Sequence, residues 1–386
     1  MVEGVSSIDI ASSDDPRAVS RVMREEPVMR VEGFTLITQR EHVESALRNA
    51  AVFSSGAEAV DLGNVRPLIP LQIDPPKHVK YRRILDPLFG PRAMASLEGE
   101  IVDLVRELID RFAARGSCDV HAEFSVPLPC TVFLRLLGLP QDDLELFLSM
   151  KDGIVRPEGE TLKVQTLQRQ ATATVIYDYF QETIDKRRAN PTEDLLTQIM
   201  NAELDGERLT DEEVLDICFL FIIAGLDTVT DSLNCIFAHL AQHPRDQRRI
   251  VDDPSVVPSA VEELLRWESP VPAVPRVATQ DADVGGCPIR VGEQVMLLIA
   301  SANTDDSAAP QLDAVDLYRN PNPHFAFGGG IHRCLGSHLA RLELRVALSE
   351  FHLRIPEYSL APGTVLHYTP GLRSLHELPM IFEARS

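Results

Sequence analysis

The amino-acid sequence predicts a mainly α-helical protein with small β-sheets, folded as one domain over residues 1–386. Most segments carry apolar residues at helical spacing. The longest covers residues 210–242, which would make a helix of about 45 Å. Runs rich in β-branched and aromatic residues are short and are separated by glycine turns. Apolar residues make up 44% of the chain, which is enough for a sizeable core.

The expected elements follow from local signals along the chain. Asp15 and Pro16 predict the start of a helix that ends near residue 25, and Gly33 predicts a hairpin turn between 28–31 and 34–38. Residues 50–73 lack periodicity and predict a long functional loop. Further helices are expected at 40–49, 77–83, 94–114, 126–137, 143–151, 162–188 and 258–267, and strands at 276–279, 288–290 and 294–299, with 365–368 pairing 378–382.

Composition limits the possible partners and compartments. The chain has 37 basic and 58 acidic residues, a net charge of −21, which argues against nucleic acid or an anionic membrane as partner. Its six cysteines form no CxxC pair, which predicts reduced thiols. The first twenty residues show no signal-peptide pattern. The longest apolar run, residues 217–226, is about half of a membrane span. We expect a cytoplasmic monomer that neither spans nor binds a membrane.

A glycine-rich loop near the C-terminus contains the most informative cysteine. The stretch reads Phe327-Gly328-Gly329-Gly330-Ile331-His332-Arg333-Cys334-Leu335-Gly336, and a helical pattern follows it. Consecutive glycines allow a backbone to approach a flat cofactor closely. A cysteine at a helix N-terminus favours the thiolate, and nearby N–H groups can tune a metal bound to it. A lone cysteine is more often an inert buried residue, so the spacing around it decides the interpretation.

The longest predicted helix breaks its own pattern in the middle. Thr210 and Glu213 form a capping box at its start, and residues 217–223 are apolar all round. Ala224-Gly225-Leu226-Asp227-Thr228 then places a glycine, an acid and a hydroxyl inside a buried helix, where each is locally unfavourable. Such a departure indicates function, although a kink tolerated for packing is the alternative.

Two charged patterns are ambiguous when taken alone. His78 and Arg82 are four apart on the predicted helix after residue 74, which is compatible with a solvated basic face. Glu263 and Arg266 are three apart, which is compatible with an ordinary surface ion pair.

These motifs, in this order, resemble the cytochrome P450 family of haem-thiolate monooxygenases over residues 15–382. The resemblance implies that Cys334 is the axial ligand of haem b (iron protoporphyrin IX) and that the haem lies between the long central helix and the cysteine loop. The small pair Ala224 and Gly225 would give O2 room beside the helix, and Asp227 and Thr228 would deliver protons for oxygen activation. Phe327 and Gly336 complete the cofactor-binding signature, and the propionate contacts would be His78, Arg82, Arg276 and His332.

The resemblance also assigns structural, substrate and partner residues. Glu263, Arg266 and Arg319 would form a buried structural triad. The substrate pocket would contain apolar side chains, namely Leu62, Leu68, Leu220, Ala224, Val271, Val274 and Leu375. Electrons would come from a separate acidic ferredoxin and its reductase, which would dock on a basic face formed by Lys77, Lys80, Arg83, Arg333 and Arg341.

The expected activity is the insertion of one oxygen atom from O2 into a hydrophobic small molecule. Two alternatives remain at this point. One is an enzyme of the same fold that uses peroxide directly or performs a rearrangement without oxygen insertion. The other is a haem-based sensor or binding protein, which would need an axial ligand but no acid–threonine pair.

Overall fold

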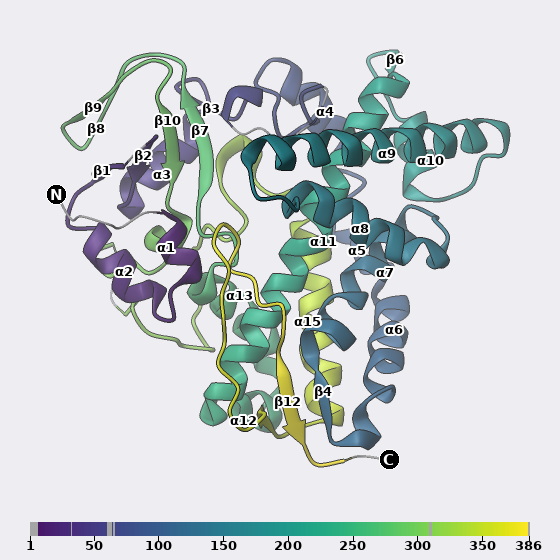
Figure 1. The fold of residues 1–386 in the computed structure, drawn as a ribbon, viewed down its shortest axis with the longest axis vertical. Helices are drawn as coiled ribbons and strands as arrows, with labels where there is room; N and C mark the ends of the chain where they lie inside the picture. Colours follow the sequence, from purple (N-terminus) through teal and green to yellow (C-terminus); the bar gives the residue numbers. More distant parts are fainter. Residues whose placement is uncertain (1–6, 32, 60–63, 65, 309–310, 385–386) are drawn as a thin grey trace. The chain divides into compact units, whose positions relative to one another are not determined.

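The computed structural model describes residues 7–31, 33–59, 64, 66–308 and 311–384. Figure 1 draws these residues as a ribbon coloured along the sequence. They form two compact units. Unit 1 lies within residues 1–54, 94–128 and 228–386, and unit 2 within residues 55–93 and 129–227. Helix α11 (Asp211–Gln242) contributes its first half to unit 2 and its second half to unit 1. The expectation of one domain stays a prediction.

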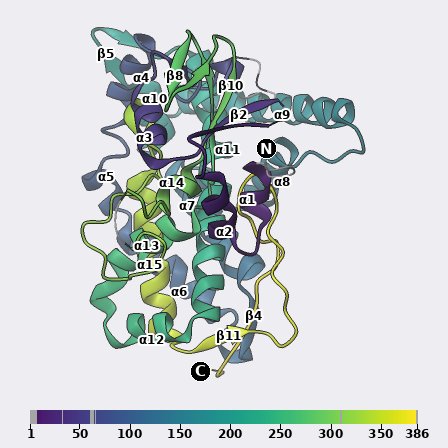
Figure 2. The same cartoon turned by 90° about the vertical axis from the view of Figure 1, so that its left-hand side faces the viewer.

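Unit 1 contains helices from all three of its segments. Helices α13, α15 and α6 pack side by side, as both ribbon views show (Figures 1 and 2). Phe237 of α11 and Phe351 of α15 have their ring centroids 4.6 Å apart and their planes tilted by 52°, in a core that also holds Phe112 and Phe124. The helices are α1 (Ser7–Ser12), α2 (Pro16–Met23), α3 (Arg40–Arg48), α6 (Glu98–Asp110), α12 (Pro244–Asp252), α13 (Val257–Glu268), α14 (Ile299–Asn303) and α15 (Ser337–Arg354).

Unit 1 also contains three small sheets. The largest has the order β1-β2-β10-β7-β3, in which β10 pairs with β2 in parallel and every other neighbouring pair is antiparallel. Its strands are β1 (Val28–Val31), β2 (Phe34–Ile37), β3 (Phe53–Ser54), β7 (Val274–Ala278) and β10 (Gln294–Leu297). The other two contain β4 (Ser117–Asp119), β11 (Tyr358–Leu360) and β12 (Pro379–Phe382), and β8 (Ala282–Val284) and β9 (Cys287–Ile289).

In the part of unit 2 that the structure describes, the regular elements are helices apart from one short hairpin. Its helices are α4 (Lys77–Leu85), α8 (Leu144–Val155), α9 (Leu162–Ala189) and α10 (Leu195–Asn201), and its hairpin pairs β5 (Glu203–Leu204) with β6 (Glu207–Arg208). Two further helices, α5 (Pro91–Ala95) and α7 (Pro127–Leu136), cross the limits between the units. The capping box at the start of α11 is present: Thr210 N–H donates to Glu213 Oε2 at 2.8 Å, and Glu213 N–H donates to Thr210 Oγ1 at 3.2 Å.

The mainly α class with small sheets is confirmed, and one strand prediction is wrong. Residues 365–368 do not form a strand paired with 378–382. Instead β12 pairs on one side with β11 and on the other with β4. The reason is physical: both main-chain edges of β12 already have partners, so the predicted segment has no edge left to join.

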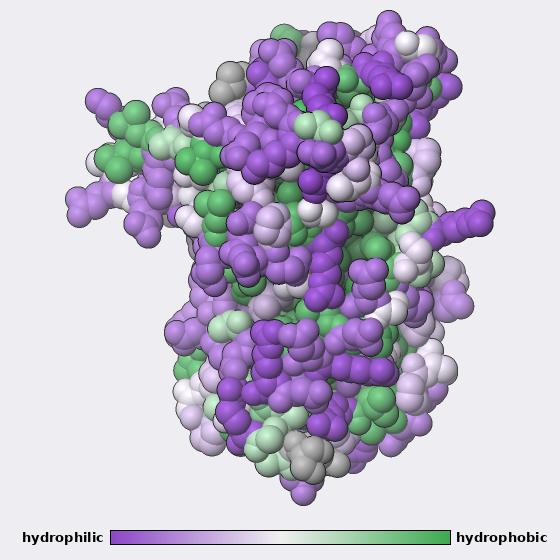
Figure 3. Space-filling model, turned by 90° about the vertical axis from the view of Figure 1, so that its right-hand side faces the viewer, coloured by the Kyte–Doolittle hydropathy of each residue, from purple (hydrophilic) through white to green (hydrophobic). Residues whose placement is uncertain are grey.

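On the face drawn in Figure 3, hydrophilic side chains predominate, with smaller apolar areas between them. Among the residues that the structure describes, none of the helices is both long and apolar enough to cross a membrane.

Candidate active site

Cys334 lies on the loop between a single 3-10 turn (Gly330–His332) and helix α15. Its N–H donates to the carbonyl of Phe327 at 2.9 Å, which closes the loop. All six cysteines fall within the described residues. Four of them are buried, Cys287 is partly buried, and Cys334 alone is exposed.

Glycine is required at two positions of this loop. Gly328 has φ +67° and Gly330 has φ +64°, a region that other residues rarely adopt. A Cβ atom at Gly330 would also lie 2.1 Å from the carbonyl oxygen of Leu47 in α3. The loop is therefore fixed against α3 by a contact that no other residue allows.

The residues present fit a haem bound through Cys334. A planar cofactor must be able to reach its thiolate ligand, and Cys334 is the one exposed cysteine among the six. Burial raises the pKa of the thiols of Cys118, Cys218 and Cys235, which disfavours their thiolate form. The choice of ligand that the resemblance implied therefore agrees with accessibility.

Helix α11 has an open stretch at the predicted oxygen-activation motif. Leu220, Leu226 and Asp227 are buried, whereas Ala224 is exposed and Thr228 is partly exposed. Ala224 and Thr228 are four residues apart and so share one face of the helix. A small side chain and a hydroxyl are thus accessible together in the middle of a buried helix.

Asp227 is held by two cations within unit 2. Lys151 Nζ of α8 lies 2.8 Å from Asp227 Oδ1, and Arg156 Nη1 lies 3.1 Å from Oδ2. Burial alone would lower the pKa of Lys151, but Asp227 and Asp152 raise it, so Lys151 stays charged. The carboxylate of Asp227 is therefore locked in an ion pair and does not point freely into solvent.

The four residues expected at the propionates occur in both units. In unit 2, His78 is 2% exposed, and Arg82 Nε pairs with Asp86 Oδ1 at 2.8 Å. Burial, reinforced by the charge of Arg82, lowers the pKa of His78. In unit 1, Arg276 of β7 is 7% exposed and donates to its neighbouring carbonyl, Pro275 O, at 2.6 Å. His332 is partly exposed in the turn before Cys334.

The structure brings Glu263, Arg266 and Arg319 together in unit 1. Arg266 donates to both carboxylate oxygens of Glu263 at 2.7 and 2.8 Å, and Arg319 Nε donates to Glu263 Oε2 at 3.1 Å. Glu263 and Arg266 are both 0% exposed. Glu263 also accepts from Asp316 N–H at 2.7 Å and from Asn322 Nδ2 at 3.0 Å. The carboxylate thus fixes the segment that leads to the cysteine loop.

The predicted pocket residues differ in accessibility. Ala224 is exposed and Val271 and Val274 are partly exposed. Leu68, Leu220 and Leu375 are 0%, 7% and 1% exposed, so the described conformation covers them with protein. Leu62 lies outside the described residues.

Leu375 belongs to a C-terminal turn, residues 369–375, that is attached to the second half of α11. Asn234 Nδ2 donates to the Leu375 carbonyl at 3.0 Å, and Ser374 Oγ donates to Asp231 Oδ2 at 2.7 Å. Ser374, Leu375 and Asp231 are each 1% exposed. Buried polar contacts of this kind set the position of the turn precisely.

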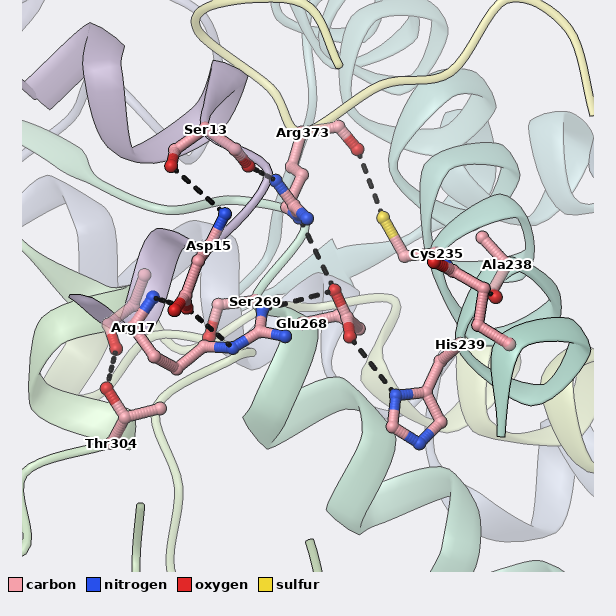
Figure 4. Close-up of polar contacts among 12 residues, drawn as sticks. Ser13, Asp15, Arg17, Cys235, Ala238, His239, Glu268, Ser269, Thr304 and Arg373 are labelled. Carbon is pink, nitrogen blue, oxygen red and sulfur yellow. Dashed lines mark hydrogen bonds and ion pairs between the residues drawn. The ribbon is translucent and has the colours of Figure 1, made fainter. Parts of the chain in front are cut away.

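Arg373, in the same turn, enters a buried ion cluster (Figure 4). Its Nε lies 3.3 Å from Glu268 Oε2, and Glu268 also faces Arg17 at 3.6 Å and His239 at 3.5 Å. Burial alone would raise the pKa of Glu268, but the hydrogen bond from His239 and the charges of Arg17 and Arg373 lower it to about 2. The cluster connects α2, α11, α13 and the C-terminal turn.

The predicted basic docking face is partly neutralised. Lys80 pairs with Glu207 at 3.0 Å and Arg83 lies 3.7 Å from Asp205, both within unit 2. Lys77 and Arg333 are exposed. Arg341 is only 23% exposed and is paired with Glu262 of α13. A carboxylate that is distant in sequence thus compensates the charge of Arg341, and its place on a docking face stays a prediction.

Sequence reasoning missed several residues that hold the site. Lys151 and Arg156 bind Asp227, Glu262 binds Arg341, and Glu268 binds Arg373. One signal was available, since Lys151 follows an otherwise apolar helical face. The others had none, because each pair joins residues far apart in the chain.

Comparisons with known proteins agree on one family. The family model described as "Cytochrome P450" matches residues 146–356. The chain is 34% identical to a steroid C26-monooxygenase of Mycobacterium tuberculosis over 96% of this chain and 94% of that protein. It is also 34% identical to the mycinamicin IV hydroxylase/epoxidase of Micromonospora griseorubida, over 92% and 93%. The crystal structure of CYP109E1 from Bacillus megaterium in complex with testosterone has a TM-score of 0.85 at 29% identity, over 96% and 99% of the two chains.

Proposed function

The chain belongs to the cytochrome P450 family and is a haem b monooxygenase, and we propose that it hydroxylates or epoxidises a hydrophobic small molecule with electrons from a separate acidic ferredoxin and its reductase. The observation that carries the residue assignment is the exposure of Cys334, which is alone among the six cysteines in being open. When bound, haem supplies the activation of O2 that the reaction needs.

We assign Cys334 as the axial ligand. The bond from its N–H to Phe327 fixes the loop, and glycine at 328 and 330 permits its shape. His78, Arg82, Arg276 and His332 would bind the propionates. The lowered pKa of His78 makes it a neutral hydrogen-bond donor at pH 7, whereas the arginines would supply the charge that balances a carboxylate.

Asp227 and Thr228 would hold and move protons beside the substrate. Thr228 offers a partly exposed hydroxyl on the same face of α11 as Ala224. Asp227 would first have to leave Lys151 and Arg156, because both of its oxygens face a cation. Proton transfer through Asp227 would therefore require a side-chain rearrangement at α8. The rate of proton transfer would then depend on the rate of that rearrangement.

We propose a compact, largely apolar substrate of roughly steroid size. The names of the relatives include a steroid C26-monooxygenase, and CYP109E1 was crystallised with testosterone. Mycinamicin IV hydroxylase/epoxidase shows that the family also includes catalysts for other scaffolds. The partly exposed apolar residues Val271 and Val274, together with Ala224, support a hydrophobic ligand.

Electron delivery would use the exposed part of the basic face. Lys77 and Arg333 retain exposed side chains, whereas Lys80 and Arg83 lie beside acids and would contribute less. Exposed charges of this kind act mainly on the rate of association, and salt screens them over about 8–10 Å.

The Cys334→Ser variant tests the assignment. The wild-type protein loaded with haem, reduced and exposed to CO should show the strongly red-shifted Soret band of a thiolate complex, and the variant should not. Cys287→Ser is the matched control, since Cys287 is the other cysteine that is not fully buried. Retention of the band in Cys334→Ser would overturn the choice of ligand.

A second assay tests the reaction. Turnover of testosterone and of a panel of apolar compounds should depend on O2, a ferredoxin and its reductase. Product formed with hydrogen peroxide alone, at the same rate and without the electron donors, would instead identify a peroxide-using enzyme.

A further inference from the structure

Glu262 of α13 holds three hydrogen-bond donors behind the cysteine loop, all within unit 1. Arg341 Nε donates to Glu262 Oε1 at 2.6 Å, and Arg341 Nη2 donates to Oε2 at 2.8 Å. His324 Nε2 lies 3.0 Å from the same Oε2, and its Nδ1 accepts from Ala326 N–H at 3.2 Å. One neutral tautomer of His324 satisfies both of its bonds. A bidentate arginine–carboxylate pair of this kind has a fixed geometry.

The electrostatics favour the charged form of this carboxylate. Burial alone would raise the pKa of Glu262, but the hydrogen bonds from His324 and Arg341 more than offset it and lower the pKa to about 2. Glu262 and Arg341 are 27% and 23% exposed at their side chains. The pair therefore carries no net charge near neutral pH.

Arg341 connects this pair to the cysteine loop through Phe327. Its guanidinium lies 4.2 Å from the centroid of the Phe327 ring. The carbonyl of Phe327 in turn accepts the N–H of Cys334 at 2.9 Å. A cation over an aromatic face fixes the ring as well as attracting it. The chain of contacts therefore runs from Glu262 through Arg341 and Phe327 to the backbone of Cys334.

We propose that Glu262 and Arg341 form a charge-balanced clamp that positions Phe327 behind Cys334 and sets the reduction potential of the bound haem. The proposal rests on the assignment of Cys334 as ligand. It gives both residues a positioning role and assigns the charge of Arg341 to the pair with Glu262, not to the docking face.

The charges predict opposite effects for the two partners. Removal of the Glu262 charge leaves an uncompensated cation near the thiolate, which stabilises the more negative reduced state and raises the potential. Removal of the Arg341 charge leaves an uncompensated anion and lowers it. Removal of both charges restores the balance, so the potential returns toward that of the wild type, although the loop loses its clamp.

The test compares Glu262→Gln, Arg341→Gln and the double variant by spectroelectrochemical titration of the haem-loaded protein. We expect the reduction potential to rise in Glu262→Gln, to fall in Arg341→Gln, and to return toward the wild-type value in the double variant. Arg341→Lys keeps the charge but cannot form the bidentate pair, so it should keep the potential while losing the red-shifted CO band faster on warming.

Glu350→Gln is the matched control. Glu350 lies on the same helix, α15, and forms a bidentate pair with Arg106 of α6 at 2.8 and 3.1 Å. Glu350 lies about two turns further along the helix from Cys334 than Arg341 does. The same change of charge at Glu350 should therefore leave the reduction potential near that of the wild type.

Shifts of the same sign in Glu262→Gln and Arg341→Gln, or shifts no larger than that of Glu350→Gln, would overturn the clamp. If Glu262→Gln does not take up haem, Arg341→Gln and Arg341→Lys are compared instead. The proposal then requires a lower reduction potential in Arg341→Gln than in Arg341→Lys. A wild-type protein without the thiolate CO band would instead show that the assignment of Cys334 has failed. Salt-dependent slowing of reduction by a ferredoxin in Arg341→Gln, at an unchanged reduction potential, would return Arg341 to the docking face and refute the proposal.

Discussion

Glu343 should make the stability of this protein fall as the pH rises. It lies on α15 between the buried residues Leu342 and Leu344, is 2% exposed, and its Oε2 has no hydrogen-bond partner among the described residues. Burial raises the pKa of this carboxyl from 4.5 to about 8. The native protein therefore keeps the proton at pH 7, whereas the unfolded chain releases it.

The size of the effect follows from the two pKa values. Because the native pKa is the higher one, the free energy of unfolding falls as the pH rises from about 4.5 and levels off above about 8. From pH 4.5 to pH 7 the free energy of unfolding falls by ~1.36 kcal/mol per pH unit over ~2.5 units, which is about 3 kcal/mol. Glu343→Gln has nearly the same shape and one neutral state, so it should be more stable than the wild type by up to that amount at pH 7. At pH 5 the two should differ by less than about 1 kcal/mol.

Urea unfolding of the haem-loaded proteins at pH 5, 6, 7 and 8 measures this difference. Glu357→Gln is the control, because Glu357 is exposed just after the same helix. The wild-type midpoint should decline with pH relative to that of Glu343→Gln, and Glu357→Gln should follow the wild type. Parallel pH profiles for the wild type and Glu343→Gln would refute the reasoning, since they would mean that Glu343 is ionised in the native protein.

Four further outcomes are expected. Thr228→Ala should consume reductant but form less product and more hydrogen peroxide, whereas Thr228→Ser should stay coupled; equal product per reductant in both would remove the hydroxyl from proton delivery. Glu263→Gln should lower haem content and stability by about 3–5 kcal/mol, because it leaves a buried arginine without its carboxylate; a haem-replete variant with an unchanged melting temperature would contradict this. Arg373→Gln should increase amide hydrogen exchange in residues 369–375 more than Arg373→Lys does, and equal exchange in both would show that the ion pair does not hold the turn. Lys77→Glu should slow stopped-flow reduction by a ferredoxin, with a weaker effect at high salt and no change in substrate affinity; a rate that does not vary with salt would exclude Lys77 from docking.

Local sequence signals predicted much of the fold. The capping box of Thr210 and Glu213 and the hairpin at Gly33 depend on residues close together in the chain, and both are present in the structure. Helix α8 continues through Gly153 to Val155, beyond the predicted end, because tertiary packing outweighs the helix propensity of glycine. The β-strand pairing of β12 could not be predicted, since β4 is distant in sequence and alternation of residues does not identify a partner strand.

The contacts that hold the candidate site could not be predicted from the sequence either. Arg341 and Glu262 are 79 residues apart, and Arg373 and Glu268 are 105 apart. Charged residues on a helix are most often solvated, so a charge pattern alone cannot separate a clamp from a surface pair. Arg341 illustrates this: its place on the helix was compatible with a docking face, and only the three-dimensional contact with Glu262 shows that its charge is compensated.

Helix α13 concentrates three carboxylates, each of which holds a different part of the chain. Glu262 contacts the segment of His324 and Arg341, Glu263 contacts Arg319, and Glu268 contacts Arg373. This arrangement has a consequence for recombining the chain with its relatives. A hybrid whose crossover separates α13 from residues 311–375 would take the acids and their basic partners from different parents, and would lose each of the three contacts at which the parents differ. Crossovers that keep residues 257–375 from a single parent should therefore give a much larger share of haem-binding hybrids than crossovers placed inside that block.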